Sequence, residues 1–225
     1  MATTHNRNAL AKHAPLAGLA AAGLYVLGFV LLEVGVGTPG VESTPQEIAA
    51  FFDKKGGPLL LGHFVLGVGV LCLLIFLSRM FSLFESGESE SSRFIARLGL
   101  ASGVAVGTLI WASSAPQIAA VFASQERSLS PPTAETLLYL GLGIFTVGYL
   151  PTALSLAAAA VLMFRSDALP TWLAWFTGAV ALILLIPYIG WGLFPILLLL
   201  WLVIVTIPVW RASIRDSDRT TLDTD

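Results

Sequence analysis

Charge is what this sequence has least of. Only 12% of its 225 residues are Asp, Glu, Lys or Arg, whereas 56% are hydrophobic. Soluble domains carry about 25% charged residues, so this composition excludes an ordinary water-soluble protein. The alternation of apolar and polar residues that is typical of a membrane β-barrel is missing as well. The sequence therefore predicts an all-α fold, a polytopic transmembrane helical bundle.

Residues that bind metals or form disulfides are equally scarce. The single cysteine, Cys72, excludes an intramolecular disulfide and a zinc site built from cysteines. Two of the three histidines, His5 and His13, lie in the N-terminal tail, far along the chain from His63. We therefore expect neither a metal nor a cofactor. The formal net charge of -2 gives no reason to expect a nucleic-acid partner.

Loops long enough to form a soluble domain are absent too. Short polar connections separate the apolar runs, so any site must lie within the helices or at their edges. We expect the membrane to be crossed by the runs 15–37, 58–81, 98–125, 133–164, 169–186 and 192–210. The transmembrane domain then covers 15–211. A polar tail covers 1–14, and a second tail, expected to be disordered, covers 212–225.

The uncharged run 98–125 is the predicted centre of the bundle. Gly99, Gly103 and Gly107 recur at every fourth position and therefore share one face of a helix. Such a face lets a second helix approach closely, and in lipid the dispersion contacts hold the pair together. Farther along lie polar residues and a helix breaker: Ser113, Ser114, Pro116 and Gln117.

The run 133–164 is too long for one straight crossing. Pro151 lies inside it. Proline cannot donate a backbone hydrogen bond, and its ring clashes with the preceding turn, so we expect a kink there.

The connection 41–57 carries the signals of a short amphipathic helix in the first outer loop. Thr44 and Glu47 form a capping-box pattern, and Pro45 suits the first helical position. Gly56 is expected to end the helix. Two interpretations are equally open: the helix lies on the membrane surface, or it packs over the bundle.

Basic residues predict the orientation. Nine of them fall on the side that holds both chain termini: Arg7, Lys12, Arg79, Arg93, Arg97, Arg165, Arg211, Arg215 and Arg219. Only Lys54, Lys55 and Arg127 fall on the other side. Because cytoplasmic loops are enriched in Lys and Arg, we expect both termini in the cytoplasm.

Three polar residues lie near the predicted outer ends of the first three spans: Glu33, His63 and Gln117. An ionisable group at membrane depth is costly unless it is paired or faces water. Our hypothesis is an outward-facing polar pocket for a lipid headgroup or a small polar solute, with Ser113 and Ser114 as further donors. The structural alternative is that Glu33 and His63 hydrogen-bond to each other or reach the interface.

Four stretches resemble a family. They are KHAPLAGLAAAGLYVLGFV, TPQEIAAFFDKKGGPLLLGHF, ALPTWLAWFTGAVALILLIP and LLLLWLVIVTIPVWR. In this order they are similar to uncharacterised, actinobacterial-type multi-pass membrane proteins. The resemblance implies the architecture and a bacterial plasma membrane, and it assigns no functional residue.

The first functional hypothesis is a non-enzymatic scaffold, accessory subunit or lipid- or small-ligand-binding module. Its expected partners are membrane lipids, a second copy or another membrane protein. A small-solute transporter or channel is the alternative that would need a polar path through the bundle. A membrane-embedded enzyme is the third hypothesis, with Glu33 and His63 as an acid–base pair.

Overall fold

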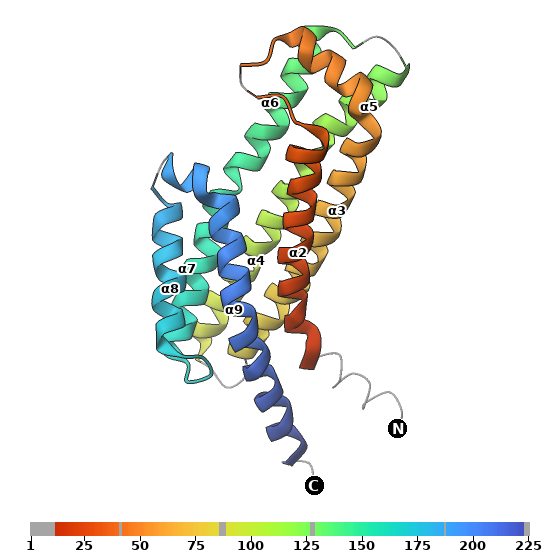
Figure 1. The fold of residues 1–225 in the computed structure, drawn as a ribbon. Helices are drawn as coiled ribbons and strands as arrows, with labels where there is room; N and C mark the ends of the chain where they lie inside the picture. The colour runs from red at the N-terminus through yellow and green to blue at the C-terminus, as the bar shows by residue number, and fades with distance from the viewer. Residues whose placement is uncertain (1–11, 41, 86–88, 127–128, 187, 223–225) are drawn as a thin grey trace. The chain divides into compact units, whose positions relative to one another are not determined.

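The chain is helical throughout the part that the structure describes. The computed structural model describes residues 12–40, 42–85, 89–126, 129–186 and 188–222, so most of the predicted tail 1–14 lies outside it. No strand occurs within these ranges, and the predicted all-α fold class is confirmed. The elements are η1 (Ala14–Leu16), α2 (Ala17–Val30), η2 (Leu31–Val36), α3 (Pro45–Glu85), α4 (Glu90–Ala112), α5 (Ser114–Glu126), α6 (Pro131–Val147), α7 (Tyr149–Arg165), α8 (Thr171–Leu184) and α9 (Ile189–Leu222) (Figure 1).

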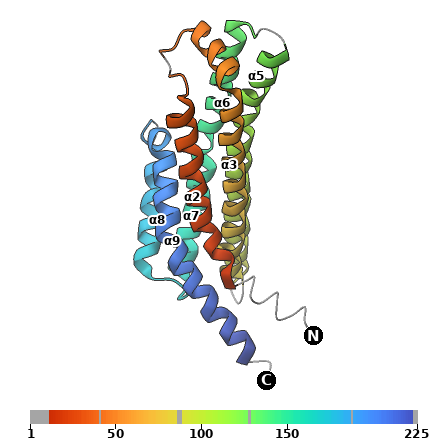
Figure 2. The same cartoon turned by 45° about the vertical axis from the view of Figure 1, so that its right-hand side comes forward.

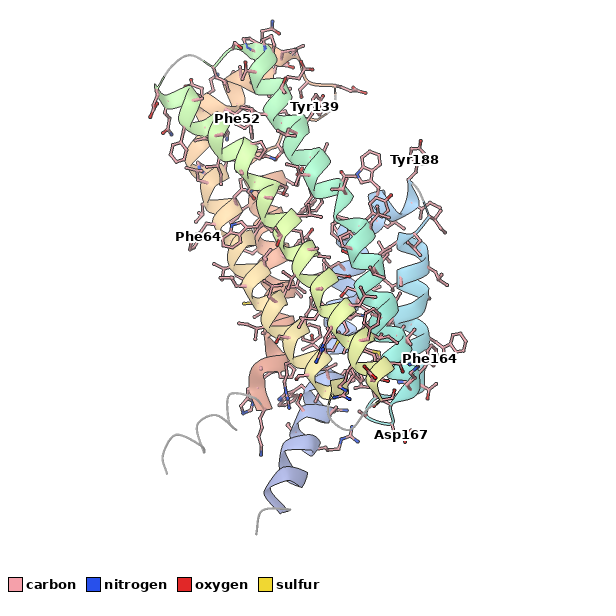
Figure 3. The ribbon with its side chains drawn as sticks, turned by 180° about the vertical axis from the view of Figure 1, so that it is seen from behind. Phe52, Phe64, Tyr139, Phe164, Asp167 and Tyr188 are labelled. Atoms are coloured by element: carbon pink, nitrogen blue, oxygen red, sulfur yellow. The ribbon has the colours of Figure 1, made fainter. Side chains whose placement is uncertain are left out.

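Length and apolar surface agree with a membrane-embedded protein. Five segments are long and apolar enough to cross a membrane: Ala14–Val36, Pro45–Phe84, Glu90–Glu126, Pro131–Arg165 and Ile189–Arg215. The predicted run 169–186 contains only the 14-residue α8. Large apolar side chains are exposed on many helices. Phe64 and Trp175 are both 69% exposed, and Phe64 points outward in Figure 3.

Two of the prolines coincide with breaks in the long runs, whereas Pro58, Pro195 and Pro208 lie inside unbroken helices. The ring of a helical proline clashes with the carbonyl four residues earlier. Pro116 stands four residues after Ala112, where α4 ends, and Pro151 stands four residues after Val147, where α6 ends. The run 133–164, in which a kink at Pro151 is expected, is divided into α6 and α7 at Gly148.

The helix expected to end at Gly56 is instead the first part of α3. The capping box is present: the Thr44 backbone N–H donates to Glu47 Oε2 at 2.7 Å, and the Glu47 N–H donates to Thr44 Oγ1 at 3.3 Å. The helix then continues through Gly56 and Pro58. Packing overrides the low helix propensity of glycine here, because a Cβ on Gly56 would lie 2.7 Å from Val121 Cγ1.

The described chain divides into two compact units. Unit 1 comprises Met1–Ala22, Leu71–Val106 and Tyr149–Asp225, and unit 2 comprises Gly23–Val70 and Gly107–Gly148.

Unit 2 is built around an apolar cluster between α3, α5, α6 and η2. Its buried members are Leu32, Val36, Ile48, Phe52, Leu59, Ala120, Val121, Ala134 and Leu138. Ile48 and Phe52 come from the amphipathic first turns of α3 and are fully buried. Of the two interpretations of this segment, the structure therefore favours the one in which it packs against neighbouring helices.

In unit 1, α7, α8 and α9 stand side by side (Figure 2). The fully buried Trp201 of α9 ties them together. Its Nε1–H donates to Thr177 Oγ1 of α8 at 3.1 Å, and that hydroxyl donates to Met163 Sδ of α7 at 3.7 Å. The Phe76 ring packs edge-on against the indole, with ring centroids 5.8 Å apart.

Two of the predicted packing glycines also lie in unit 1. A Cβ on Gly99 would overlap the Phe81 ring and lie 2.9 Å from Ala158 Cβ. A Cβ on Gly103 would lie 2.6 Å from Leu77 Cδ1. Close approach lets the Ser155 hydroxyl of α7 donate to the Gly99 carbonyl of α4 at 2.9 Å. Gly107 belongs to unit 2.

The arginines gather at one end of unit 1. Every arginine whose side chain the structure describes belongs to this unit: Arg79, Arg93, Arg97, Arg165, Arg211 and Arg215. They stand where α3, α7 and α9 end and where α4 begins, and these helix ends lie together at the end of unit 1 that also holds η1 (Figure 1). Asp167 marks this end in Figure 3, whereas Tyr188 marks the other. Arg7 and Arg127 lie outside the described residues.

The C-terminal segment differs from the prediction. α9 continues past Trp210 to Leu222, so the predicted disordered tail 212–225 is helical up to that residue. Residues 211–222 contain neither proline nor glycine, so nothing in the local sequence interrupts the helix.

We expect Trp201→Phe to lower the free energy of unfolding by about 1–3 kcal/mol, because it removes the hydrogen bond to Thr177 and leaves a small void. Reversible unfolding in mixed detergent micelles measures this change. Trp172→Phe is the matched control, since that side chain is 55% exposed. Equal effects of the two substitutions would contradict the role assigned to Trp201.

Candidate functional site

Unit 2 brings two of the predicted site residues into contact. His63 of α3 is 6% exposed, and its Nε2 lies 3.1 Å from Gln117 Oε1 of α5. Gln117 is half-buried. The break before α5 places Gln117 in the first turn of a new helix, where its side chain reaches α3. The pair is therefore a tertiary contact that the break at Pro116 makes possible.

Gly141 of α6 completes the surroundings of this pair. A Cβ there would lie 2.7 Å from the Ser113 carbonyl oxygen and 3.2 Å from Gln117 Nε2. Only a residue without a side chain lets α6 approach the Gln117 amide this closely. The prediction missed Gly141, and an isolated glycine inside a helical run was the only signal for it.

One ring nitrogen of His63 is left over. Nδ1 is buried and has no hydrogen-bond partner among the residues that the structure describes. A neutral imidazole carries one donor and one acceptor, so the bond to Gln117 uses only one of the two. A buried polar atom without a partner costs about 1–3 kcal/mol. Nδ1 thus has unused capacity for one hydrogen bond, as does the buried Tyr25 hydroxyl of the same unit.

Glu33 does not join the pair. It lies on the π-helical turn η2, its side chain is exposed, and it makes no hydrogen bond or ion pair with any described residue. Leu32 and Val36 occupy the buried face of this turn instead, with Leu32 seated against Gly62. The predicted three-residue pocket is thus reduced to His63 and Gln117, and the hydrogen bond expected between Glu33 and His63 is absent.

Ser113 and Ser114 lie at the junction between α4 and α5. Both are buried, with Ser113 8% and Ser114 3% exposed. The Ser113 hydroxyl donates to the Ile110 carbonyl at 2.6 Å, in the last turn of α4. Its proton is therefore already used in a hydrogen bond within the chain. Ser113 can therefore act toward a ligand only as an acceptor.

The chemistry that His63 and Gln117 offer together is hydrogen bonding. Within the described ranges, no group of three or more His, Cys, Asp or Glu side chains comes together. The Gln117 amide oxygen accepts from Nε2–H, so Nδ1 of the neutral ring is an acceptor and a ligand would donate to it. Gln117 fixes the orientation of the imidazole.

Comparison of the chain with protein-family models, with curated proteins and with solved structures found no match. The resemblance to actinobacterial-type membrane proteins therefore stays a prediction, and the site is interpreted from its geometry.

We expect Gly141→Ala to lower the free energy of unfolding by about 1–3 kcal/mol, because the new methyl group meets a backbone oxygen that cannot move easily. Gly143→Ala on the same helix is the matched control, since nothing lies within 4 Å of a Cβ there. The control should be neutral or gain up to about 1 kcal/mol from helix propensity. Thermal unfolding of both variants in detergent measures the difference, and a stable Gly141→Ala variant would refute the close contact.

Proposed function

We propose that the protein is a non-enzymatic integral membrane protein that binds a lipid headgroup or a small polar molecule at His63. The observation that supports this proposal is the buried Nδ1 without a partner beside an imidazole that Gln117 already orients. Hydrogen bonds to protein are the usual way to satisfy a polar atom where water is scarce. A bound hydroxyl or N–H group would supply the missing partner, because Nδ1 of the neutral ring accepts.

We infer that the chain lies in a bacterial plasma membrane with both termini in the cytoplasm. The gathering of arginines at one end of unit 1 supports this orientation, because cytoplasmic segments are enriched in Lys and Arg. Exposed Trp172 and Trp175 stand in the first turns of α8 near this end, and exposed Tyr188 lies at the other, as expected for two interfacial belts. Membrane lipids, a second copy or another membrane protein are the proposed partners.

We expect native mass spectrometry of the protein, released gently from its own membrane, to show a bound lipid or polar molecule that His63→Ala loses. Gln117→Ala should weaken its retention, because the ring then turns freely. Glu33→Gln is the matched control, since Glu33 is exposed and unpaired among the described residues. The same bound molecules in all four proteins would overturn the proposal.

A double-mutant cycle on His63 and Gln117 separates binding from stability. The hydrogen bond alone should contribute a coupling of about 0.6 kcal/mol, and at most about 2 kcal/mol, to the free energy of unfolding. If the two residues are coupled in stability but none of the single variants changes the bound molecules seen by native mass spectrometry, the hydrogen bond between them is only structural.

We expect a reporter protein fused after residue 225 to be active only in a form that folds in the cytoplasm. A second fusion between residues 188 and 189, at the opposite end of unit 1, should report the other side of the membrane. Cytoplasmic activity of the second fusion alone would reverse the proposed orientation.

A further inference from the structure

An exposed apolar face runs along the first span in unit 2. Its large apolar side chains are between 42% and 78% exposed. Their spacing of one, three or four residues places them on one side of the helix, together with a carboxylate. We call this surface the α2 face, and it consists of Gly23, Val26, Leu27, Val30, Glu33 and Val34. The described part of the chain does not cover it.

The span that carries the α2 face is the least covered of the candidate spans. In an apolar stretch of 18 residues within Ala14–Val36, 22% is buried, whereas the corresponding shares in the other four spans lie between 39% and 56%. A Cβ on Gly23 would meet nothing within 4 Å. A helix from a second molecule can therefore approach closely at Gly23, and in lipid such close contact holds helices together.

The carboxylate of Glu33 lacks a partner on this face. Glu33 lies three residues before Val36, the last residue of the span, and it makes no hydrogen bond or ion pair with any described residue. An ionisable group at membrane depth is costly unless it is paired or faces water. An occupant of the α2 face that brings a positive charge would lower this cost.

Two lysines of the same unit carry matching charges. Lys54 and Lys55 of α3 are exposed, and they too make no hydrogen bond or ion pair with described residues. The last turn of the first span and the first turns of α3 lie at the same end of unit 2, because a short connection joins them (Figure 1). Glu33 and the two lysines are therefore opposite charges at one end of the unit.

The packing of η2 against α3 relates the depths of these charges. Leu32 contacts α3 at Gly62. Lys55 precedes Gly62 by seven residues, which corresponds to about 10 Å along the helix. The flexible four-carbon stem of a lysine and the side chain of Glu33 can together bridge such a distance.

A two-fold axis would bring these charges together. Most homo-oligomers are two-fold dimers, in which each contact between two different residues occurs twice. Two copies with the same orientation in the membrane are related by an axis along the membrane normal, so equivalent residues keep the same depth. Glu33 of each copy can then face a lysine of the other, and both pairs form across one interface.

We propose that the α2 face is the interface of a homodimer, in which Glu33 of each copy pairs with the partner subunit's Lys54 or the partner subunit's Lys55. The apolar side chains of the face and the open surface at Gly23 provide the close contact between the two copies. The inference rests on the membrane location proposed above. It does not depend on binding at His63, because His63 is buried and is not part of the α2 face.

The first test uses two charge-reversed forms of the full chain with different tags. One carries Glu33→Lys, and the other carries Lys54→Glu together with Lys55→Glu. Each form alone places like charges across the interface, so native mass spectrometry in detergent should show a dimer dissociation constant at least about tenfold above that of the wild type. Co-expression of the two forms should yield a mixed dimer, because both pairs of opposite charge are restored.

Glu42→Lys is the matched control. It makes the same charge change at another exposed carboxylate in the connection that leads to α3. Water and salt screen an exposed charge outside the interface, so the dissociation constant should stay within about twofold of the wild type.

A second test leaves the charges unchanged and is made in the native membrane. In a Cys72→Ser background, the single variants Gly23→Cys, Leu27→Cys and Val30→Cys place a thiol on the α2 face. Mild oxidation should link at least one of them into a covalent dimer, because a disulfide forms only where two Cα atoms lie within about 7 Å. Leu182→Cys is the control, since that residue is 67% exposed on α8 of unit 1, and it should stay unlinked.

Four outcomes would overturn the proposal. A wild-type chain that is monomeric in detergent and unlinked at all three positions in the membrane would exclude the interface. Dimers that persist in both charge-reversed forms would exclude the ion pairs, and the absence of a mixed dimer would do the same. A different membrane protein linked to the α2 face would replace the second copy as its occupant. Retention of a molecule at His63 by either charge-reversed form would show that this form folds, so failure of the dimer and failure of the His63 proposal are distinguishable.

Discussion

Backbone hydrogen bonding in an apolar environment is the constraint on which this structure depends. Where water is scarce, each N–H and C=O must find a partner in the protein, and a helix provides one within its own segment. The described chain is accordingly almost all helix, and its long runs break only where proline removes a donor. Pro116 and Pro151 each follow a helix end by four residues. At the first break, the Ser113 hydroxyl bonds to the Ile110 carbonyl.

Small residues determine how closely the helices approach. In lipid the hydrophobic effect does not favour one helix over the surrounding hydrocarbon, so close contact must supply the attraction. Gly99 and Gly103 allow such close contact in unit 1, where α4 packs against Phe81, Leu77 and α7. Gly56, Gly62 and Gly141 allow it in unit 2. The same close approach creates polar contacts, such as the bond from Ser155 to the Gly99 carbonyl.

The polar side chains of the long apolar helices are accommodated in three ways. His63 is buried, and one of its ring nitrogens forms a hydrogen bond with Gln117. The side chain of Glu33 is exposed on the protein surface rather than buried between helices. Arg79 lines an open groove, and its Nη1 donates a hydrogen bond to Ser82 Oγ. The first arrangement leaves Nδ1 of His63 without a hydrogen-bond partner among the described residues, and the binding proposed for His63 depends on this atom.

Features that depend on local chemistry could be predicted from the amino-acid order alone. Scarce charge and long apolar runs predicted the all-α fold, Pro151 predicted a kink in the run that the structure divides into α6 and α7, and Thr44 with Glu47 predicted a helix start. Each of the two local effects acts within a few residues. How the helices affect one another became visible only in the folded chain. Packing of Gly56 on Val121 carried α3 through an expected end. Because Leu32 and Val36 are buried, Glu33 lies on the exposed face of the same turn, away from His63. Because Gly141 has no side chain, α6 can pack closely against Gln117. These outcomes depend on contacts between residues distant in the sequence, which no local pattern records.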